Sequence, residues 1–237
     1  MPVIRDAGEC ALLVRFGDRS DAGVGARVLA LDVALSAEAL AGLVECVPAY
    51  AALMVHYDPL ILPRAALLAR VETALLRPVG DAAGGETWLL PACADPALAE
   101  DLGHVAEATG LSPARVTALH LGATYRVCMY GFAPGWAYLD GLPEALALPR
   151  RPRPRDLIPA GSLIVAGGQA IVAGGAMPSG WHILGRTPER MFAPGRDPVV
   201  LMAPGDWLRF DPVDLTTFHA LEAEAAAGRV LARRVPG

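Results

Sequence analysis

The spacing of apolar residues in the first eighty residues predicts a small two-layer α/β domain. Apolar residues recur every three or four positions over residues 24–35 and again after Pro63, which indicates two helices with one apolar face each. Residues 52–57 alternate between apolar and smaller or polar side chains, as a half-buried strand does. Two further strands are expected at residues 10–16 and 43–47. Strands and helices in this order suit one sheet covered by helices.

A glycine-rich stretch at residues 81–85 follows these elements and has the composition of a linker. We expect a domain boundary there, with one domain at residues 1–84 and a second at residues 85–237. A chain of 237 residues is long enough to bury two modest hydrophobic cores.

The second domain begins with a helical pattern and then changes to a β pattern. A strand is expected at residues 87–91, and helices at residues 95–109 and 113–120, the second with Ser112 as its N-cap. A final helix is expected at residues 215–226. Short apolar runs between glycine-rich turns predict strands at residues 125–130, 162–166, 169–173, 181–184, 199–202 and 207–210. These strands favour a closed or nearly closed β structure, so the fold class is α+β.

Charge and hydrophobicity exclude two kinds of partner. The net charge of −5 provides no basic surface for nucleic acid or an anionic membrane. Residues 157–185 carry no charge and are long enough to span a bilayer as a helix, but two prolines and seven glycines break them into short strands. Residues 1–6 lack the basic start and long apolar stretch of a secretory signal, so a cytoplasmic location is expected.

The types of basic and thiol side chains narrow the chemistry further. All 20 basic residues are arginine. Without lysine, the chain cannot form a Schiff base with pyridoxal phosphate, carry biotin, or hold phosphates with a Walker A lysine. Cys10, Cys46, Cys93 and Cys128 are scattered, without CxxC pairs or clustered histidines. They are expected to be reduced, buried thiols, and no metal site is expected.

The second domain contains strings of residues that are more specific than any generic motif. A histidine at a predicted helix end, in His-Leu-Gly-Ala-Thr-Tyr at 120–125, precedes Gly-Phe-Ala-Pro-Gly-Trp-Ala-Tyr-Leu-Asp at 131–140. Further strings are Ile-Pro-Ala-Gly-Ser at 158–162, Ala-Gly-Gly-Gln at 166–169, Pro-Ser-Gly-Trp at 178–181 and Gly-Arg-Thr-Pro at 185–188. With these strings the chain resembles the KipI family, which includes the B subunit of 5-oxoprolinase and allophanate hydrolase subunit 1. It also resembles the carboxyltransferase portion of urea carboxylase.

This resemblance implies a small α/β domain followed by a cyclophilin-like β-barrel. It also implies one component of a heteromeric ATP-dependent amidohydrolase, either the lactam-opening 5-oxoprolinase type or a related allophanate or urea-type enzyme. The expected partners are a second cyclophilin-like protein, which is the C subunit of 5-oxoprolinase or allophanate hydrolase subunit 2, and a third partner of the A type. ATP is expected in the complex, on this chain or on a partner. The alternative is a KipI-like regulator that inhibits a sensor histidine kinase, and fold analogy alone adds a peptidyl-prolyl isomerase.

Seven residues are candidates for a functional site. Six of them stand in these strings, and the seventh, Arg155, stands in a Pro-Arg pair at residues 154–155 that also matches the family. His120 suits proton transfer near neutral pH, and Arg186, which follows the uncharged run, suits an anionic group. Both are candidate catalytic residues. The candidates for substrate binding are Tyr138, Arg155, Ser162, Gln169 and Trp181. Two alternatives stay open, because His120 can instead cap a helix end and Trp181 can instead pack in a core.

One string departs from the family pattern. Many members have Gln-Thr-Gly-Ile-Tyr-Pro where this chain has Gln-Ala-Ile-Val-Ala-Gly at residues 169–174. The missing threonine and tyrosine hydroxyls predict an altered substrate preference, because a buried polar group without a partner costs about 1 to 3 kcal/mol. Arg151 and Arg153 lie between prolines and are expected on a solvated loop.

Overall fold

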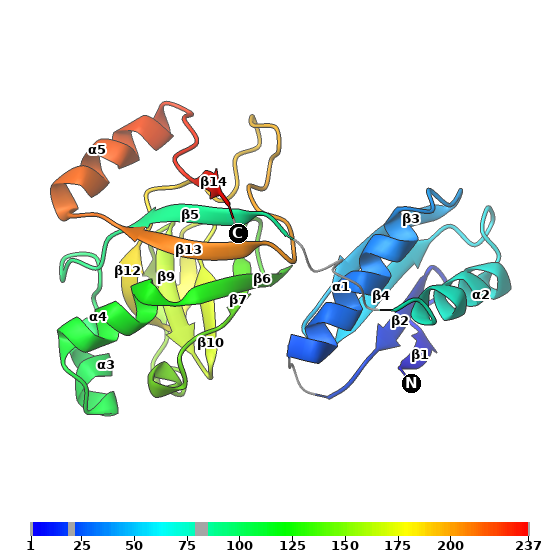
Figure 1. The fold of residues 1–237 in the computed structure, drawn as a ribbon, viewed down its shortest axis with the longest axis horizontal. Helices are drawn as coiled ribbons and strands as arrows, with labels where there is room; N and C mark the ends of the chain where they lie inside the picture. Colours follow the sequence, from blue (N-terminus) through cyan, green and yellow to red (C-terminus); the bar gives the residue numbers. More distant parts are fainter. Residues whose placement is uncertain (1, 19–21, 79–84, 237) are drawn as a thin grey trace. The chain divides into compact units, whose positions relative to one another are not determined.

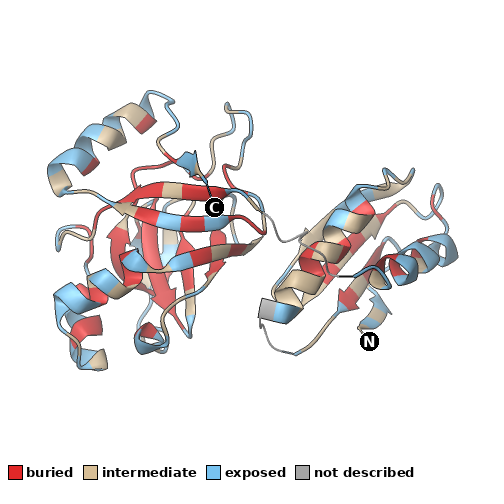
Figure 2. Ribbon diagram, viewed as in Figure 1, coloured by how far each residue is buried: buried red, intermediate tan, exposed pale blue. Residues whose placement is uncertain are grey.

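The computed structural model of the chain describes residues 2–18, 22–78 and 85–236 (Figure 1). The chain divides into two compact units, Met1–Gly85 and Glu86–Gly237. Residues 81–84 of the expected linker lie outside the described residues. Each unit has its own sheet and its own hydrophobic core, and Figure 2 shows the buried residues concentrated on the strands and on one side of the helices.

The first unit is a four-stranded antiparallel sheet with the strand order β1-β2-β4-β3. Its elements are β1 (Val3–Asp6), β2 (Ala11–Arg15), α1 (Ala22–Ser36), β3 (Leu43–Pro48), β4 (Ala52–Tyr57) and α2 (Arg64–Leu75). Alternate residues of β2 and β4, such as Leu12, Val14 and Val55, are fully buried with the apolar residues of both helices. The pattern therefore predicted every element of this unit except β1, most of which is exposed and carries no alternation to detect.

The second unit contains an eight-stranded sheet with the order β12-β9-β10-β7-β6-β13-β5-β14 (Figure 1). Its strands are β5 (Thr87–Ala92), β6 (Thr124–Tyr130), β7 (Ala137–Asp140), β9 (Ser162–Ala166), β10 (Gln169–Val172), β12 (His182–Arg186), β13 (Trp207–Pro212) and β14 (Arg233–Val235). The pairing of β5 with β13 is parallel, and the other pairings are antiparallel. A separate hairpin-like pair joins β8 (Arg155–Ile158) to β11 (Met177–Ser179).

The large sheet is open, which corrects the cyclophilin-like β-barrel that the resemblance implied. Within residues 85–236 no ladder of hydrogen bonds joins the two end strands, β12 and β14. The sheet curls far enough for one contact across the gap: Cys93, after β5, and Arg186 of β12 exchange backbone hydrogen bonds of 2.8 and 2.9 Å. The backbone of Arg186 is thus fixed where the two ends of the sheet approach each other.

The two faces of this sheet bury different clusters. Side chains such as Leu163 and Val165 form the main core together with apolar residues of α3 (Leu102–Thr109) and α4 (Pro113–Gly122). The alternate side chains, such as Ile164, form a second cluster that includes residues of β8 and β11. The β8–β11 pair therefore covers the second face, and Pro178 and Ser179 of β11 line the aromatic cavity described below.

Helix α3 begins at Leu102 and not at residue 95, as the pattern predicted. The cause is Asp101, whose backbone N–H donates to the carbonyl of Ile183 and whose carboxylate accepts the N–H of Ile183 at 2.8 Å. These bonds hold Asp101 against β12, and the residues before it form turns. Helix α4 agrees with its prediction, because the Ser112 hydroxyl accepts the N–H of Arg115.

Two other expectations were wrong. Residues 199–202 form no strand, and their one β-type contact is a bridge between Phe192 and Val200. All four cysteines are free thiols, but only Cys93 is buried; Cys10 is exposed, and Cys46 and Cys128 are partly exposed.

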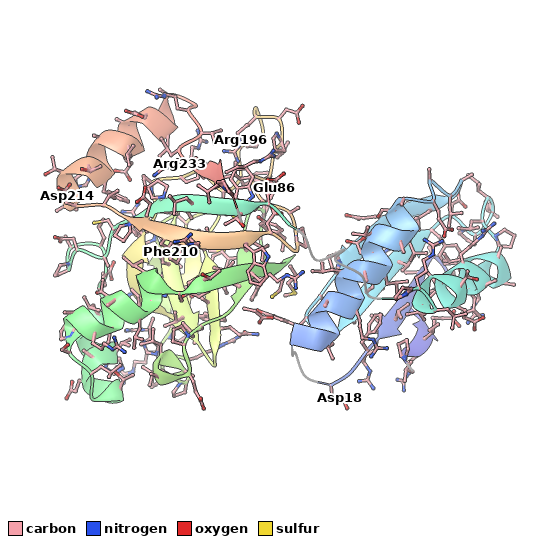
Figure 3. The ribbon with its side chains drawn as sticks, viewed as in Figure 1. Asp18, Glu86, Arg196, Phe210, Asp214 and Arg233 are labelled. Atoms are coloured by element: carbon pink, nitrogen blue, oxygen red, sulfur yellow. The ribbon has the colours of Figure 1, made fainter. Side chains whose placement is uncertain are left out.

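The last helix, α5 (Leu215–Ala226), agrees with its prediction, and Figure 3 labels Asp214 at its start. The Asp214 carboxylate accepts the N–H of Thr217 at 2.7 Å and so caps the helix. Only two residues of α5, Phe218 and Ala225, are buried. In the described part of the chain, no helix has both the length and the apolar character needed to span a bilayer.

Candidate functional site

An aromatic cavity of about 220 Å³ lies in the second unit, between the loop of residues 131–136 and the segment that precedes β12. Phe132 and Trp136 of the loop meet with ring centroids 5.3 Å apart, and Tyr138 and Trp181 meet at 6.3 Å, both nearly edge to face. Two predicted substrate-binding residues, Tyr138 and Trp181, therefore line one cavity. Trp181 is also buried in the second apolar cluster, in agreement with its alternative role in a core. Its walls suit a small, flat, largely apolar group.

Phe132 is held in an unusual backbone conformation at this cavity. Its φ of 71° lies in the left-handed region, which costs a non-glycine residue about 1 to 3 kcal/mol. The loop is closed by hydrogen bonds from Ala133 to Gly131 and from Trp136 to Ala133. The Phe132 side chain is 73% exposed and extends the aromatic wall outward.

Arg150 brings a positive charge to the aromatic cavity. Its guanidinium carbon lies 5.6 Å from the centre of the Trp181 ring, a cation–π contact. Among residues 85–236 no carboxylate forms an ion pair with Arg150. Four aromatic side chains and one guanidinium without a carboxylate partner among residues 85–236 suit a small ring that carries a carboxylate.

Arg155 does not face this cavity as a free ligand, because its guanidinium binds Asp101. The two hydrogen bonds measure 2.7 and 2.9 Å, and Glu100 contacts the same guanidinium at 3.2 Å. Arg151 binds the same Asp101 carboxylate, so the expectation that Arg151 is solvated was wrong; Arg153 is exposed as predicted. The sequence therefore identified Arg155 as special but did not reveal its partner.

The Asp101 carboxylate, 3% exposed, joins three elements that position the cavity. Burial by itself would raise the pKa of Asp101, but the hydrogen bonds from Arg155 and from the Ile183 N–H, with the charges of Arg155 and Arg151, lower it. The carboxylate is thus ionised at neutral pH and ties β8, the loop of residues 149–154 and β12 together.

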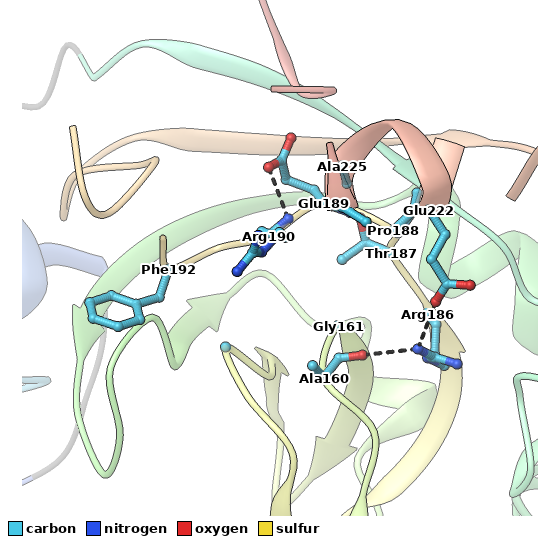
Figure 4. Close-up of a pocket in the computed structure, with 12 residues that line it drawn as sticks. Ala160, Gly161, Arg186, Thr187, Pro188, Glu189, Arg190, Phe192, Glu222 and Ala225 are labelled. Atoms are coloured by element: carbon cyan, nitrogen blue, oxygen red, sulfur yellow. Dashed lines mark hydrogen bonds and ion pairs between the residues drawn. The ribbon is translucent and has the colours of Figure 1, made fainter. Parts of the chain in front are cut away.

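A second cavity, of about 370 Å³, contains Arg186 and lies beneath α5 (Figure 4). One terminal nitrogen of Arg186 donates to the carbonyl of Ala160 and to the carboxylate of Glu222, both at 3.3 Å. The guanidinium also lies 5.4 Å from the ring of Phe218. Arg186 therefore faces a cavity, as its prediction requires, with a carboxylate of the same chain beside it.

Two neighbouring residues of this cavity have opposite roles. The Glu189 carboxylate is fully buried and accepts the backbone N–H groups of Arg190, Leu231 and Ala232, together with a guanidinium N–H of Arg196. Glu189 is thus a structural anchor without capacity for a ligand. Arg190, by contrast, is exposed, and in the described residues no carboxylate pairs with its guanidinium.

The loop of residues 131–136 separates the two cavities. On one side it carries Phe132 and Trp136. On its other side, a Cβ atom at Gly174 would overlap the carbonyl oxygen of Pro134, and one at Gly135 would lie 2.6 Å from the Cβ atom of Phe192. Gly174 and Phe192 line the Arg186 cavity. The loop is therefore packed tightly between the walls of both cavities, with no room for an added Cβ atom at Gly135 or Gly174.

His120 lies apart from both cavities. Its ring is 1% exposed, its Nδ1 atom lies 2.7 Å from the Tyr125 hydroxyl, and it packs against Phe210. Burial lowers the pKa of His120 to about 4, so the ring is neutral at pH 7. This geometry fits the alternative of a packed helix-end histidine, and proton transfer by His120 stays a prediction.

The remaining candidates do not line either cavity. The Ser162 hydroxyl is fully buried and donates to the carbonyl of Pro159 at 2.7 Å, which stabilises the turn before β9. Gln169 begins β10 and is partly exposed. Ala170, where the family pattern given above has threonine, belongs to the main core and lines neither cavity.

Several cavity residues escaped the sequence analysis. Phe132 and Trp136 stand in the string at residues 131–140, where the alternation with glycine and proline was the available signal. Arg150 stands in the arginine–proline run at residues 149–155, which was interpreted as a solvated basic loop, and Arg190 stands in no distinctive local pattern. Within the described residues, no group of three or more His, Cys, Asp or Glu side chains is arranged to hold a metal ion.

Comparisons with known proteins agree with this architecture. Residues 2–202 match the family described as the carboxyltransferase domain, subdomains C and D. The B subunit of 5-oxoprolinase from Bacillus subtilis (strain 168) is 32% identical over 233 residues, which cover 94% of this chain and 97% of that protein. The match confirms the resemblance read from the residue strings.

Solved structures show the same fold. The crystal structure of TTHA0988 matches 86% of this chain at 36% identity with a TM-score of 0.76, and this chain spans 40% of its length. The Kluyveromyces lactis urea amidolyase matches 99% of this chain and 16% of its own at 17% identity, with a TM-score of 0.74, which shows the fold alone. The chain belongs to the carboxyltransferase domain family, subdomains C and D.

Proposed function

We propose that the chain is one component of a heteromeric, ATP-dependent amidohydrolase that opens a small lactam or amide, with 5-oxoproline as the leading substrate. The match to the B subunit of 5-oxoprolinase along nearly the whole of both chains carries this proposal. A second cyclophilin-like protein and a third partner, of the C and A types, complete the complex.

The aromatic cavity is the part of this chain that suits such a substrate. 5-Oxoproline is a small five-membered lactam with one carboxylate. Its ring would lie among Trp136, Tyr138 and Trp181, and its carboxylate would pair with Arg150. His120 lines neither cavity, and its role in the proton transfers of ring opening stays a prediction from the sequence.

The test is turnover by the reconstituted complex. The chain is purified with its two partners, and ADP and glutamate are measured with 5-oxoproline as substrate; each component is then omitted in turn. Urea and allophanate are tested in parallel. If the complete complex turns over none of the three substrates with ATP, the proposal is wrong and the regulatory alternative becomes the better explanation.

A matched pair of variants tests the role of the cavity. Arg150→Gln should raise KM for the substrate about tenfold or more, because a charge-assisted hydrogen bond is worth about 1.5 to 3 kcal/mol. Arg153→Gln is the control, since Arg153 is exposed on the same loop and does not line the aromatic cavity. Equal KM values for the two variants would remove Arg150 from the site.

A further inference from the structure

We propose that the Arg186 cavity and an adjoining cavity form one binding site for a phosphate-class anion. Arg190 makes the principal contact with the anion, and in the free protein Glu222 forms an ion pair with Arg186 in place of the anion. The site goes beyond the function proposed above, which concerns the amide substrate. It lies on the other side of the loop of residues 131–136 from the aromatic cavity.

The two cavities share residues of their walls. The adjoining cavity, of about 330 Å³, shares Arg190 and Ala225 with the Arg186 cavity. Arg196 and Arg229 also line it. Arg190 therefore lies between the two cavities, and a ligand in either cavity can contact its guanidinium.

A count of the charges leaves Arg190 uncompensated. Arg196 pairs with Glu189 at 3.1 Å, and Arg229 pairs with Glu224 at 3.3 Å. Arg186 pairs with Glu222. Among the described residues no acidic side chain is left for Arg190, so the combined site carries an excess positive charge.

Arg186 is held loosely by its present partners. Its contacts to Ala160 and Glu222 are both 3.3 Å, longer than the roughly 2.7 to 2.9 Å of a strong charge-assisted hydrogen bond. Its Nε atom is buried without a partner among the described residues. Glu222 is 46% exposed and its other oxygen lies 3.5 Å from His219, so the carboxylate can turn toward solvent.

These features favour a dianion over a single carboxylate. Once Glu222 withdraws, Arg186 and Arg190 present two positive charges, and a phosphate dianion compensates both. The planar guanidinium matches two phosphate oxygens at once, and a chain without lysine must use arginine for this purpose. Glu222 thus acts as a built-in competitor of the ligand.

Binding of inorganic phosphate to the whole chain tests the site without any turnover. Isothermal titration at constant ionic strength should show saturable binding. Arg190→Gln should weaken it about tenfold or more, because the uncompensated charge is removed. Glu222→Gln should strengthen it by about threefold or more, because a competing negative charge is removed. Damage to the fold would not produce such a gain.

The control is an arginine outside the site. Arg153→Gln, on an exposed loop that lines neither cavity of the site, should leave phosphate binding unchanged. ADP that binds more tightly than phosphate would identify a nucleotide as the source of the phosphate group. Absence of saturable binding, equal affinity in Arg190→Gln and Arg153→Gln, or succinate bound as tightly as phosphate would overturn the proposal.

Discussion

The carboxylate of Asp101 fixes two arginines that stand four positions apart in the sequence. The motif around Arg155 marked that residue for binding, and prolines on either side suggested a solvated Arg151. Both bind Asp101, about fifty residues away in the chain, and local patterns cannot reveal a partner at that separation. Arg186 ends the strand that closes the uncharged run and lines a cavity, while its catalytic role stays a prediction.

Replacement of Asp101 should destabilise the protein strongly. Asp101→Asn leaves Arg151 and Arg155 without their buried counter-charge, at a cost of about 3 to 5 kcal/mol in the free energy of unfolding. Urea denaturation measures it. Glu100→Gln, which removes a half-exposed partner of the same Arg155, should cost less than about 1 kcal/mol. Similar losses in the two variants would contradict the role given to Asp101.

The pH dependence of Asp101 follows from its lowered pKa. The unfolded chain binds a proton more readily at this carboxylate than the folded chain does. Its stabilising contribution is therefore complete above the ordinary value of 3.8 and is lost as the pH falls toward the lower folded value. As the pH falls below about 4, the free energy of unfolding of Asp101→Asn should therefore decrease less than that of the wild type.

His120 should give the protein a separate sensitivity to acid. Because burial lowers its pKa from 6.5 to about 4, the unfolded chain binds more protons between these values. Stability should be complete above pH 6.5 and fall by about 3 kcal/mol as the pH drops to about 4. His120→Gln should flatten this part of the stability curve, measured by denaturation at each pH, and the exposed His219→Gln should not. An unchanged slope in His120→Gln would show that His120 is not buried as a neutral ring.

At the scale of the element, length and periodicity decided what the sequence could predict. The helices from 22 to 36, 113 to 122 and 215 to 226 and the longer strands were predicted, because each buries a regular face. The β8–β11 pair was missed, since its strands have four and three residues and β11 contains a proline. Pro178 and Ser179 of β11 line the aromatic cavity, so this part of its wall was not predicted.

The packing of the 131–136 loop against the residues that follow β10 can be tested with one methyl group. Gly174→Ala would place a Cβ atom 2.5 Å from the carbonyl carbon of Gly135, so the loop must shift, at a cost of about 1 to 3 kcal/mol. Thermal denaturation and the fluorescence of Trp136 report the shift. Gly175→Ala, where no atom lies within 4 Å, should change stability by less than about 0.5 kcal/mol. Equal melting temperatures in the two variants would show that the loop has room to yield.

At the scale of the whole molecule, the start of the second unit is tied into its own sheet. The Asp206 carboxylate accepts the backbone N–H of Glu86 at 2.9 Å and the indole N–H of Trp88 at 2.8 Å, and Trp207 donates to the Glu86 carbonyl. The composition of the linker suggested a boundary here, but no local pattern in the sequence predicted these hydrogen bonds.

The second unit should therefore fold without the first. A fragment of residues 86–237 retains Asp206 and every strand of the large sheet, so it should unfold in one cooperative transition in urea. Circular dichroism and near-UV spectra measure this. A fragment with a broad, non-cooperative transition would show that the two units depend on each other for folding.

The tightly packed loop between the aromatic cavity and the Arg186 cavity has a thermodynamic consequence. A ligand that shifts the loop on one side changes the shape of the wall on the other, so the two binding equilibria are linked. If an anion bound beside Arg190 changes the ligand affinity of the aromatic cavity by some factor, a ligand in the aromatic cavity must change the affinity for the anion by the same factor. The affinity of each cavity for its ligand therefore depends on whether the other cavity is occupied, and this dependence needs no chemical step.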